Sequence, residues 1–72
     1  MVTQQQLREF IGQRPFKPFR VQLNSGEELY VTRTLQAIAM PRRMVYVTPE
    51  DRLRWIELDN IDRVQSFDAS AA

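Results

Sequence analysis

Two prolines, Pro15 and Pro18, divide the chain into a helical start and an extended remainder. Each proline lacks an amide donor and biases the residue before it toward extended geometry, so a helix cannot continue through this segment. Phe16 and Phe19 lie three residues apart across it and are expected to cover the gap between the helix and the first strand. We therefore predict a stiff connection. The alternative, a proline-rich docking ligand, is disfavoured because phenylalanine stands where a polyproline groove would read the chain.

Residues 3–12 carry the signals of a short helix. Thr3 and Gln6 have the spacing of a capping box, and Gly12 marks the end of the pattern. The apolar stripe of this helix consists of Leu7, Phe10 and Ile11. Because a helix this short is marginal on its own, we expect the stripe to dock on a sheet.

The segments 19–23 and 27–33 alternate apolar and polar residues, which is the pattern of half-buried strands. A two-residue turn between them would set the apolar side chains of one strand against polar side chains of the other. A three-residue loop at 24–26, with Gly26 in the left-handed conformation, avoids this mismatch. The predicted pairs are Val21 with Leu29 and Phe19 with Val31.

The rest of the chain predicts further short strands. A brief turn at 34–36 leads into a strand at 37–41, two strands follow at 44–48 and 53–58, and a last short strand points Ile61 and Val64 inward. We assign Val45, Val47, Ile56 and Leu58 to the core side of the two middle strands, and Tyr46, Thr48 and Trp55 to the opposite side. This assignment requires an even number of residues in the loop around Pro49 that joins these strands.

These elements predict a single mainly β domain of the α+β class over residues 1–67. An N-terminal helix is followed by about five short antiparallel strands, and no crossover helices separate them. Such strands form a small, strongly bent sheet or a barrel. Residues 68–72 contain nothing to bury, and we expect them to form a disordered tail.

The chain contains neither cysteine nor histidine. Disulfides, the usual zinc and iron–sulfur sites, and the commonest acid–base and thiol chemistries all need these residues. The paired carboxylates, such as Glu57 with Asp59, lack neighbours that would separate two carboxyl pKa values. We therefore expect no enzyme, no catalytic residue, no metal and no cofactor.

The formal net charge is only +1, which gives no electrostatic footprint for duplex nucleic acid or for an anionic membrane. No stretch approaches the roughly 20 apolar residues of a membrane span, and the N-terminus lacks a signal-like apolar run. We expect a soluble, cytoplasmic protein that does not bind membranes.

Tyr46, Trp55 and the adjacent Arg54 are the candidate contact residues, because these residue types carry much of the energy of protein interfaces. Three interpretations of the aromatic face stay open. In the first, the N-terminal helix covers it through Leu7 and Phe10. In the second, another protein or a second copy of the chain binds it. In the third, it stacks nucleobases beside cationic side chains.

Nine of the ten cationic residues are arginine, which favours bidentate contacts to carboxylate or phosphate. The candidate phosphate contacts are Arg33, Arg42, Arg43 and Arg52. Ordinary surface ion pairing with the neighbouring acids is the simpler interpretation. If Arg42 and Arg52 lie at opposite ends of one hairpin, the positive charge is divided and not concentrated.

The helix, the segment "RPFKPFRVQLNSGEELYV", the valine-rich hairpin and the closing "LDNIDRV" resemble a group of short uncharacterised bacterial proteins, common in planctomycetes, that open with Pro-Phe-x-Pro-Phe-Arg. The resemblance covers residues 5–66 loosely and is specific over 15–31. It implies a compact fold and a bacterial cytosol. The order of a helix and then five strands is also similar to the Sm fold. The base-binding residues of Sm-like RNA binders are absent, since "RTLQAIAM" at 33–40 offers only Gln36 as a polar candidate.

The sequence thus favours a non-catalytic protein-interaction or self-association module. Its partner would be another protein or its own copies, joined through uncovered strand edges. The alternative is a nucleic-acid-binding small barrel that contacts RNA through the arginine patch.

Overall fold

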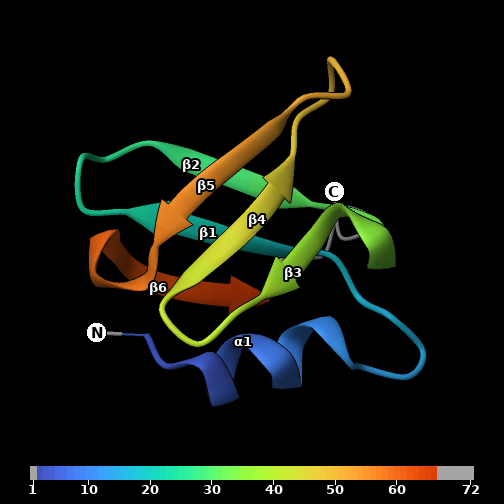
Figure 1. Cartoon of the computed structure of the whole chain (residues 1–72). Coiled ribbons are helices and arrows are strands. Elements are labelled where there is room, and N and C mark those ends of the chain that lie inside the picture. The colour runs from blue at the N-terminus through green and yellow to red at the C-terminus, as the bar shows by residue number, and fades with distance from the viewer. Residues whose placement is uncertain (1, 67–72) are drawn as a thin grey trace.

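The computed structural model describes residues 2–66, which fold into one helix and six antiparallel strands (Figure 1). The elements are α1 (Gln4–Ile11), β1 (Phe19–Leu23), β2 (Glu28–Val31), the 3₁₀ turn η1 (Thr34–Gln36), β3 (Ala37–Ala39), β4 (Arg43–Val47), β5 (Leu53–Glu57), the 3₁₀ turn η2 (Leu58–Asn60) and β6 (Ile61–Ser66). The strands form two three-stranded sheets, in the orders β2-β1-β6 and β3-β4-β5. The predicted mainly β fold is confirmed, with six strands in place of about five. Over residues 2–66 the strands form two separate sheets and no closed barrel.

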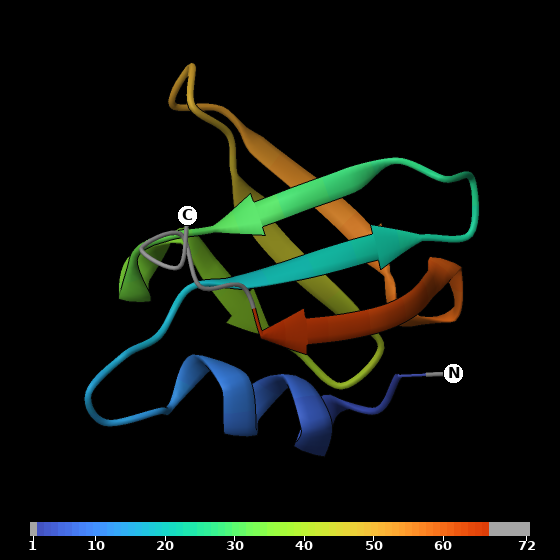
Figure 2. The ribbon, with the colours of Figure 1, turned by 180° about the vertical axis from the view of Figure 1, so that it is seen from behind.

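The helix α1 has the caps that its sequence predicts. The Thr3 hydroxyl accepts a hydrogen bond from the Gln6 amide N–H at 3.2 Å, and the Gln6 side chain accepts one from the Thr3 amide N–H at 2.9 Å. Gly12 caps the other end by donating its N–H to the Arg8 carbonyl at 2.8 Å. Leu7 is fully buried, and α1 lies across one end of the two sheets, beside β3 and β6 (Figures 1 and 2). The predicted docking of this helix on a sheet is confirmed.

The hairpin of β1 and β2 has the predicted register. Val21 pairs with Leu29 and Phe19 pairs with Val31. The loop has three residues, since the Leu23 N–H donates to the Glu27 carbonyl at 2.8 Å. Gly26 completes the loop at φ 96°. Glycine adopts this conformation with little strain because it has no side chain.

The last strand, β6, carries a bulge that explains its inward residues. Ile61 and Val64 are three residues apart, a spacing that would put them on opposite faces of a regular strand. The register with β1 shifts by one residue, so Leu23 pairs with Ile61 and Val21 pairs with Val64. Ile61 is consequently buried and Val64 packs against the core, as predicted.

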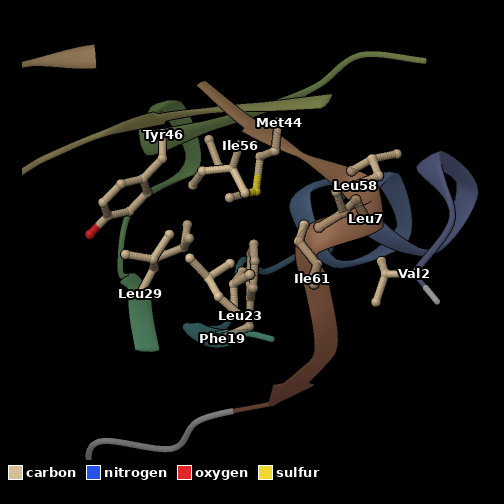
Figure 3. Close-up of a cluster of buried hydrophobic side chains, with 13 residues drawn as sticks. Val2, Leu7, Phe19, Leu23, Leu29, Met44, Tyr46, Ile56, Leu58 and Ile61 are labelled. Atoms are coloured by element: carbon tan, nitrogen blue, oxygen red, sulfur yellow. The ribbon is translucent and has the colours of Figure 1, made fainter. Parts of the chain in front are cut away.

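A single hydrophobic core fills the space between the two sheets (Figure 3). Phe19 is fully buried in it, and the rings of Phe10 and Phe16 lie 5.4 Å and 6.0 Å from the Phe19 ring. The aromatic residues of the proline segment therefore close the gap between helix and sheet, as predicted. Each fully buried apolar side chain of this size contributes roughly 1.5–3 kcal/mol.

The predicted parity of the β4–β5 hairpin is wrong. The connecting loop has three residues, because the Thr48 N–H donates to the Arg52 carbonyl at 2.7 Å and Asp51 adopts a left-handed conformation at φ 68°. An odd-numbered loop exchanges the two faces of β5 relative to an even-numbered one. The core side of this sheet is therefore formed by Met44, Tyr46 and Ile56, and the opposite side by Val45, Val47 and Trp55. Leu58 is buried as predicted, but from η2.

The side chains of Gln36 and Tyr46 join the two sheets by hydrogen bonds to the backbone of β2 and of Thr32, which follows β2. The buried Gln36 accepts a hydrogen bond from the Thr32 N–H at 2.8 Å and donates one to the Val47 carbonyl at 3.2 Å. The Tyr46 hydroxyl donates to the Tyr30 carbonyl at 3.1 Å. Gln36 is thus a structural link, because both its side-chain oxygen and its side-chain nitrogen form hydrogen bonds.

Replacing Gln36 with alanine should lower the free energy of unfolding by about 1–2 kcal/mol, because the partly buried Thr32 N–H and Val47 carbonyl both lose their hydrogen-bond partner. The midpoint of urea denaturation measures this change. Gln5→Ala, on the exposed side of α1, is the matched control and should change the free energy by less than about 0.5 kcal/mol. Equal effects of the two substitutions would contradict the structural role of Gln36.

The left-handed residue of the β4–β5 loop generates a second prediction. Asp51→Val should lower the free energy of unfolding by about 1–2 kcal/mol, because a β-branched side chain is strained at φ 68°. Asp51→Gly should leave it unchanged or raise it, whereas Glu50→Val, one residue earlier, should have little effect. Urea denaturation of the three variants decides whether the loop has the odd-numbered form.

Candidate interaction surface

No other helix or strand of residues 2–66 lies over the outward side of sheet β3-β4-β5 (Figure 1). The strand register places a set of apolar side chains on this side. Cross-strand pairing places Ile38, Val45 and Trp55 in one row and Val47 and Leu53 in the next. These five residues are called the outer face below. Ile38, Trp55 and Leu53 are 57%, 59% and 61% exposed.

The middle of the outer face shows how its side chains cover one another. Val45 is only 7% exposed although it points away from the core, because Ile38 and Trp55 flank it on the neighbouring strands. Beside this row, the Arg43 guanidinium carbon lies 6.0 Å from the centre of the Trp55 ring, and Arg43 pairs with Glu57 at 3.5 Å. The arrangement is an apolar patch with a rim of both charges, which is typical of protein contact sites.

The three predicted contact residues do not share a face. Trp55 lies on the outer face, whereas Tyr46 lies in the core (Figure 3). Burial raises the pKa of the Tyr46 hydroxyl, which is committed to the Tyr30 carbonyl. Arg54 pairs with Tyr46 across the hairpin and so points to the same side of the sheet. Of the three, Trp55 is the most exposed.

The interpretation that α1 covers Trp55 is wrong. Leu7 and Phe10 of the helix pack into the core between the sheets, against residues such as Phe19. The helix lies at one end of the sheets and leaves the outer face open (Figures 1 and 2).

Arg54 forms a two-contact ion pair with Glu27, at the start of the β2 segment. The two nitrogen–oxygen distances are 2.6 Å and 3.1 Å. Hydrogen bonding to Arg54 lowers the pKa of the Glu27 carboxyl, and the same contact raises the pKa of Arg54. This pair links the two sheets at their surface, and it already occupies the Arg54 guanidinium.

The four candidate phosphate contacts are divided between the two ends of β4. Arg42 and Arg43 stand at its start, in a hollow that Glu57 and Asp59 also line. Arg52 follows the loop at its other end, and Arg33 shares a shallow hollow with Val47 at that end. The structure therefore does not gather these arginines into one patch.

Between residues 2 and 66, no three acidic side chains are grouped so that they could hold a metal ion. The helix of this same segment is too short and too polar to cross a membrane. Comparison with known proteins finds no matching family model, no matching curated protein and no matching solved structure.

Sequence reasoning missed four of the five residues of the outer face, namely Ile38, Val45, Val47 and Leu53. The prediction puts the two valines in the core together with Ile56, which requires an even-numbered loop, whereas the three-residue loop puts Met44 and Tyr46 on the side of Ile56. Asp51 could have indicated the three-residue loop, since aspartate tolerates the left-handed conformation that completes such a loop.

The ion pair of Arg54 and Glu27 predicts a pH dependence of stability. Because Glu27 has a lowered pKa in the folded protein, its contribution is present above the unfolded value near 4.5 and is lost as the pH falls through the folded value. Arg54→Met should therefore reduce the drop in the urea midpoint between about pH 6 and about pH 3. Arg52→Met removes the same formal charge and should leave that drop unchanged. A drop of the same size in Arg54→Met would show that the pair does not couple to folding.

Proposed function

We propose that the protein is a non-catalytic module that associates with copies of itself through the outer face. The observation that carries this proposal is the exposed apolar row of Ile38, Val45 and Trp55, on the side of the sheet away from the core. Exposed apolar surface of this kind gains free energy when a partner covers it, at roughly 25 cal/mol per Å².

The composition of the outer face supports a protein contact. Tryptophan is among the residue types most enriched at the centres of interfaces, and here it stands between Val45 and the open edge of the sheet. The charged residues Arg43 and Glu57 lie beside the apolar row and not within it. A contact at Trp55 would thus bury apolar surface beside the ion pair of Arg43 and Glu57.

The charge distribution supports a second copy as the partner. The formal net charge of +1 means that two copies repel each other only weakly. The rim carries one cation and one anion, Arg43 and Glu57, so a two-fold arrangement can match it with itself.

The alternative function is RNA binding, with the two sheets acting as a small Sm-like barrel and Arg33, Arg42, Arg43 and Arg52 contacting phosphates. The division of these arginines between the two ends of β4 favours it less, and so does the engagement of Arg43 with Glu57. Such a binder would lose affinity steeply with added salt and with Arg42→Ala.

The self-association proposal is tested by sedimentation equilibrium together with the emission of Trp55, the sole tryptophan. Because Trp55 is 59% exposed in the single chain, its emission should move to shorter wavelength as the protein is concentrated and associates. Trp55→Ser should weaken the association at least about tenfold, which corresponds to about 1.4 kcal/mol. Leu35→Ser is the control, since Leu35 is 88% exposed but lies on η1, outside the outer face.

A protein that remains monomeric at high concentration, with an emission wavelength that never moves, would refute self-association. Salt-sensitive binding of a single-stranded RNA oligomer that Arg42→Ala abolishes would instead favour the alternative function.

A further inference from the structure

The backbone of β5 has an unpaired edge beside the outer face. At the two ends of the β4–β5 ladder, the Thr48 N–H donates to the Arg52 carbonyl and the Leu58 N–H donates to the Arg42 carbonyl. Hydrogen-bonding positions alternate along an antiparallel pair, so Arg54 and Ile56 also direct their backbone groups to β4. The N–H and C=O groups of Leu53, Trp55 and Glu57 consequently point away from the sheet. No described element pairs with this edge.

The other three sheet edges have neighbouring groups that the β5 edge lacks. On β2, the outward Tyr30 carbonyl accepts from the Tyr46 hydroxyl, and just beyond the strand the Thr32 N–H donates to Gln36. The strands β3 and β6 lie beside α1, which packs against β3 (Figures 1 and 2). An edge with free backbone groups and exposed apolar side chains is a template for another strand. Within residues 2–66, β5 is the edge that offers both.

We propose that two copies of the chain join by antiparallel pairing of β5 with β5, around a two-fold axis at Trp55, to form one continuous six-stranded sheet. This inference rests on the proposed function and specifies the contact through which self-association occurs. The backbone supplies the hydrogen bonds, and the two Trp55 side chains that meet at the axis supply apolar burial.

The register follows from the sequence of β5. Centring the axis on Trp55 pairs all five residues, with Leu53 opposite Glu57 and Arg54 opposite Ile56 of the second copy. Centring it on Arg54 would pair three residues and set two arginines directly opposite each other. Centring it on Ile56 would also pair only three residues. The Trp55 register is therefore the one that uses the whole strand and opposes no like charges.

The same register makes the apolar surfaces of the two copies continuous. The row of Ile38, Val45 and Trp55 ends at the β5 edge, so the row of the second copy begins at the axis with its own Trp55. At a hydrogen-bonded position of an antiparallel pair, the Cα atoms of two opposed residues lie about 5.5 Å apart. At this separation the two indole rings can pack together. Arg54 does not obstruct this contact, because Glu27 holds it on the other side of the sheet.

Amide hydrogen exchange of the full chain, followed by NMR at low and high protein concentration, tests the pairing. The amides of Leu53, Trp55 and Glu57 should exchange at least about tenfold more slowly in the concentrated sample. Those of Arg54 and Ile56, which already face β4, should change little. If sedimentation shows a dimer but the three outward amides gain no protection, edge pairing is overturned while self-association stands. If no dimer forms at any concentration, both proposals are overturned. The β5 edge would then be open to pairing with a strand of another protein.

Cysteine trapping tests the register, and the chain has no cysteine of its own to interfere. Leu53→Cys and Glu57→Cys proteins, mixed and mildly oxidised, should form a cross-linked heterodimer, because these positions oppose each other across the axis. Each variant alone should remain uncrosslinked, as should Leu35→Cys. Cross-linking of Leu53→Cys with itself, or no cross-link in the mixture, would overturn the Trp55-centred register.

Discussion

The odd number of residues in the β4–β5 loop is the constraint on which the surface of this protein depends. Asp51 in the left-handed conformation closes a three-residue loop, and the loop length decides which side of β5 enters the core. With this parity Ile56 joins Met44 and Tyr46 inside, and Trp55 is left outside. A loop one residue longer or shorter would turn Trp55 toward the core and Ile56 to the outside, if β4 kept its orientation.

The first half of the fold could be predicted from the sequence because its signals are local and agree with one another. The cap at Thr3, the prolines and the left-handed Gly26 each fix a short stretch of backbone, and in β1 and β2 only one face of each strand is apolar. In β4 both alternating sets are apolar, since Met44 and Tyr46 compete with Val45 and Val47 for the core. The apolar pattern therefore does not show which face of β4 is buried. The length of the β4–β5 loop decides this, and loop length is difficult to predict from sequence patterns.

The residues of the outer face could likewise be predicted only in part. Trp55 could be selected from the sequence as an interface residue by its chemistry, but its neighbours could not, because they follow from the register. Tyr46 was selected by the same chemical argument, and its hydroxyl instead secures the backbone of β2. Gln36 shows the converse, since a polar residue in an apolar segment proved to be a hydrogen-bonding link between the sheets.

The position of α1 beside β3 limits how far a sheet built from this chain can grow. A sheet extended at β5 ends, in each copy, at a β3 strand that lies against its own helix. In the proposed dimer, two-fold pairing occupies the β5 edge of both copies, so that the assembly would close at two chains. A protein with both edges open would propagate into a fibre. In the proposed dimer, the short N-terminal helix would thereby keep the sheet from growing at β3, in addition to its contribution to the core.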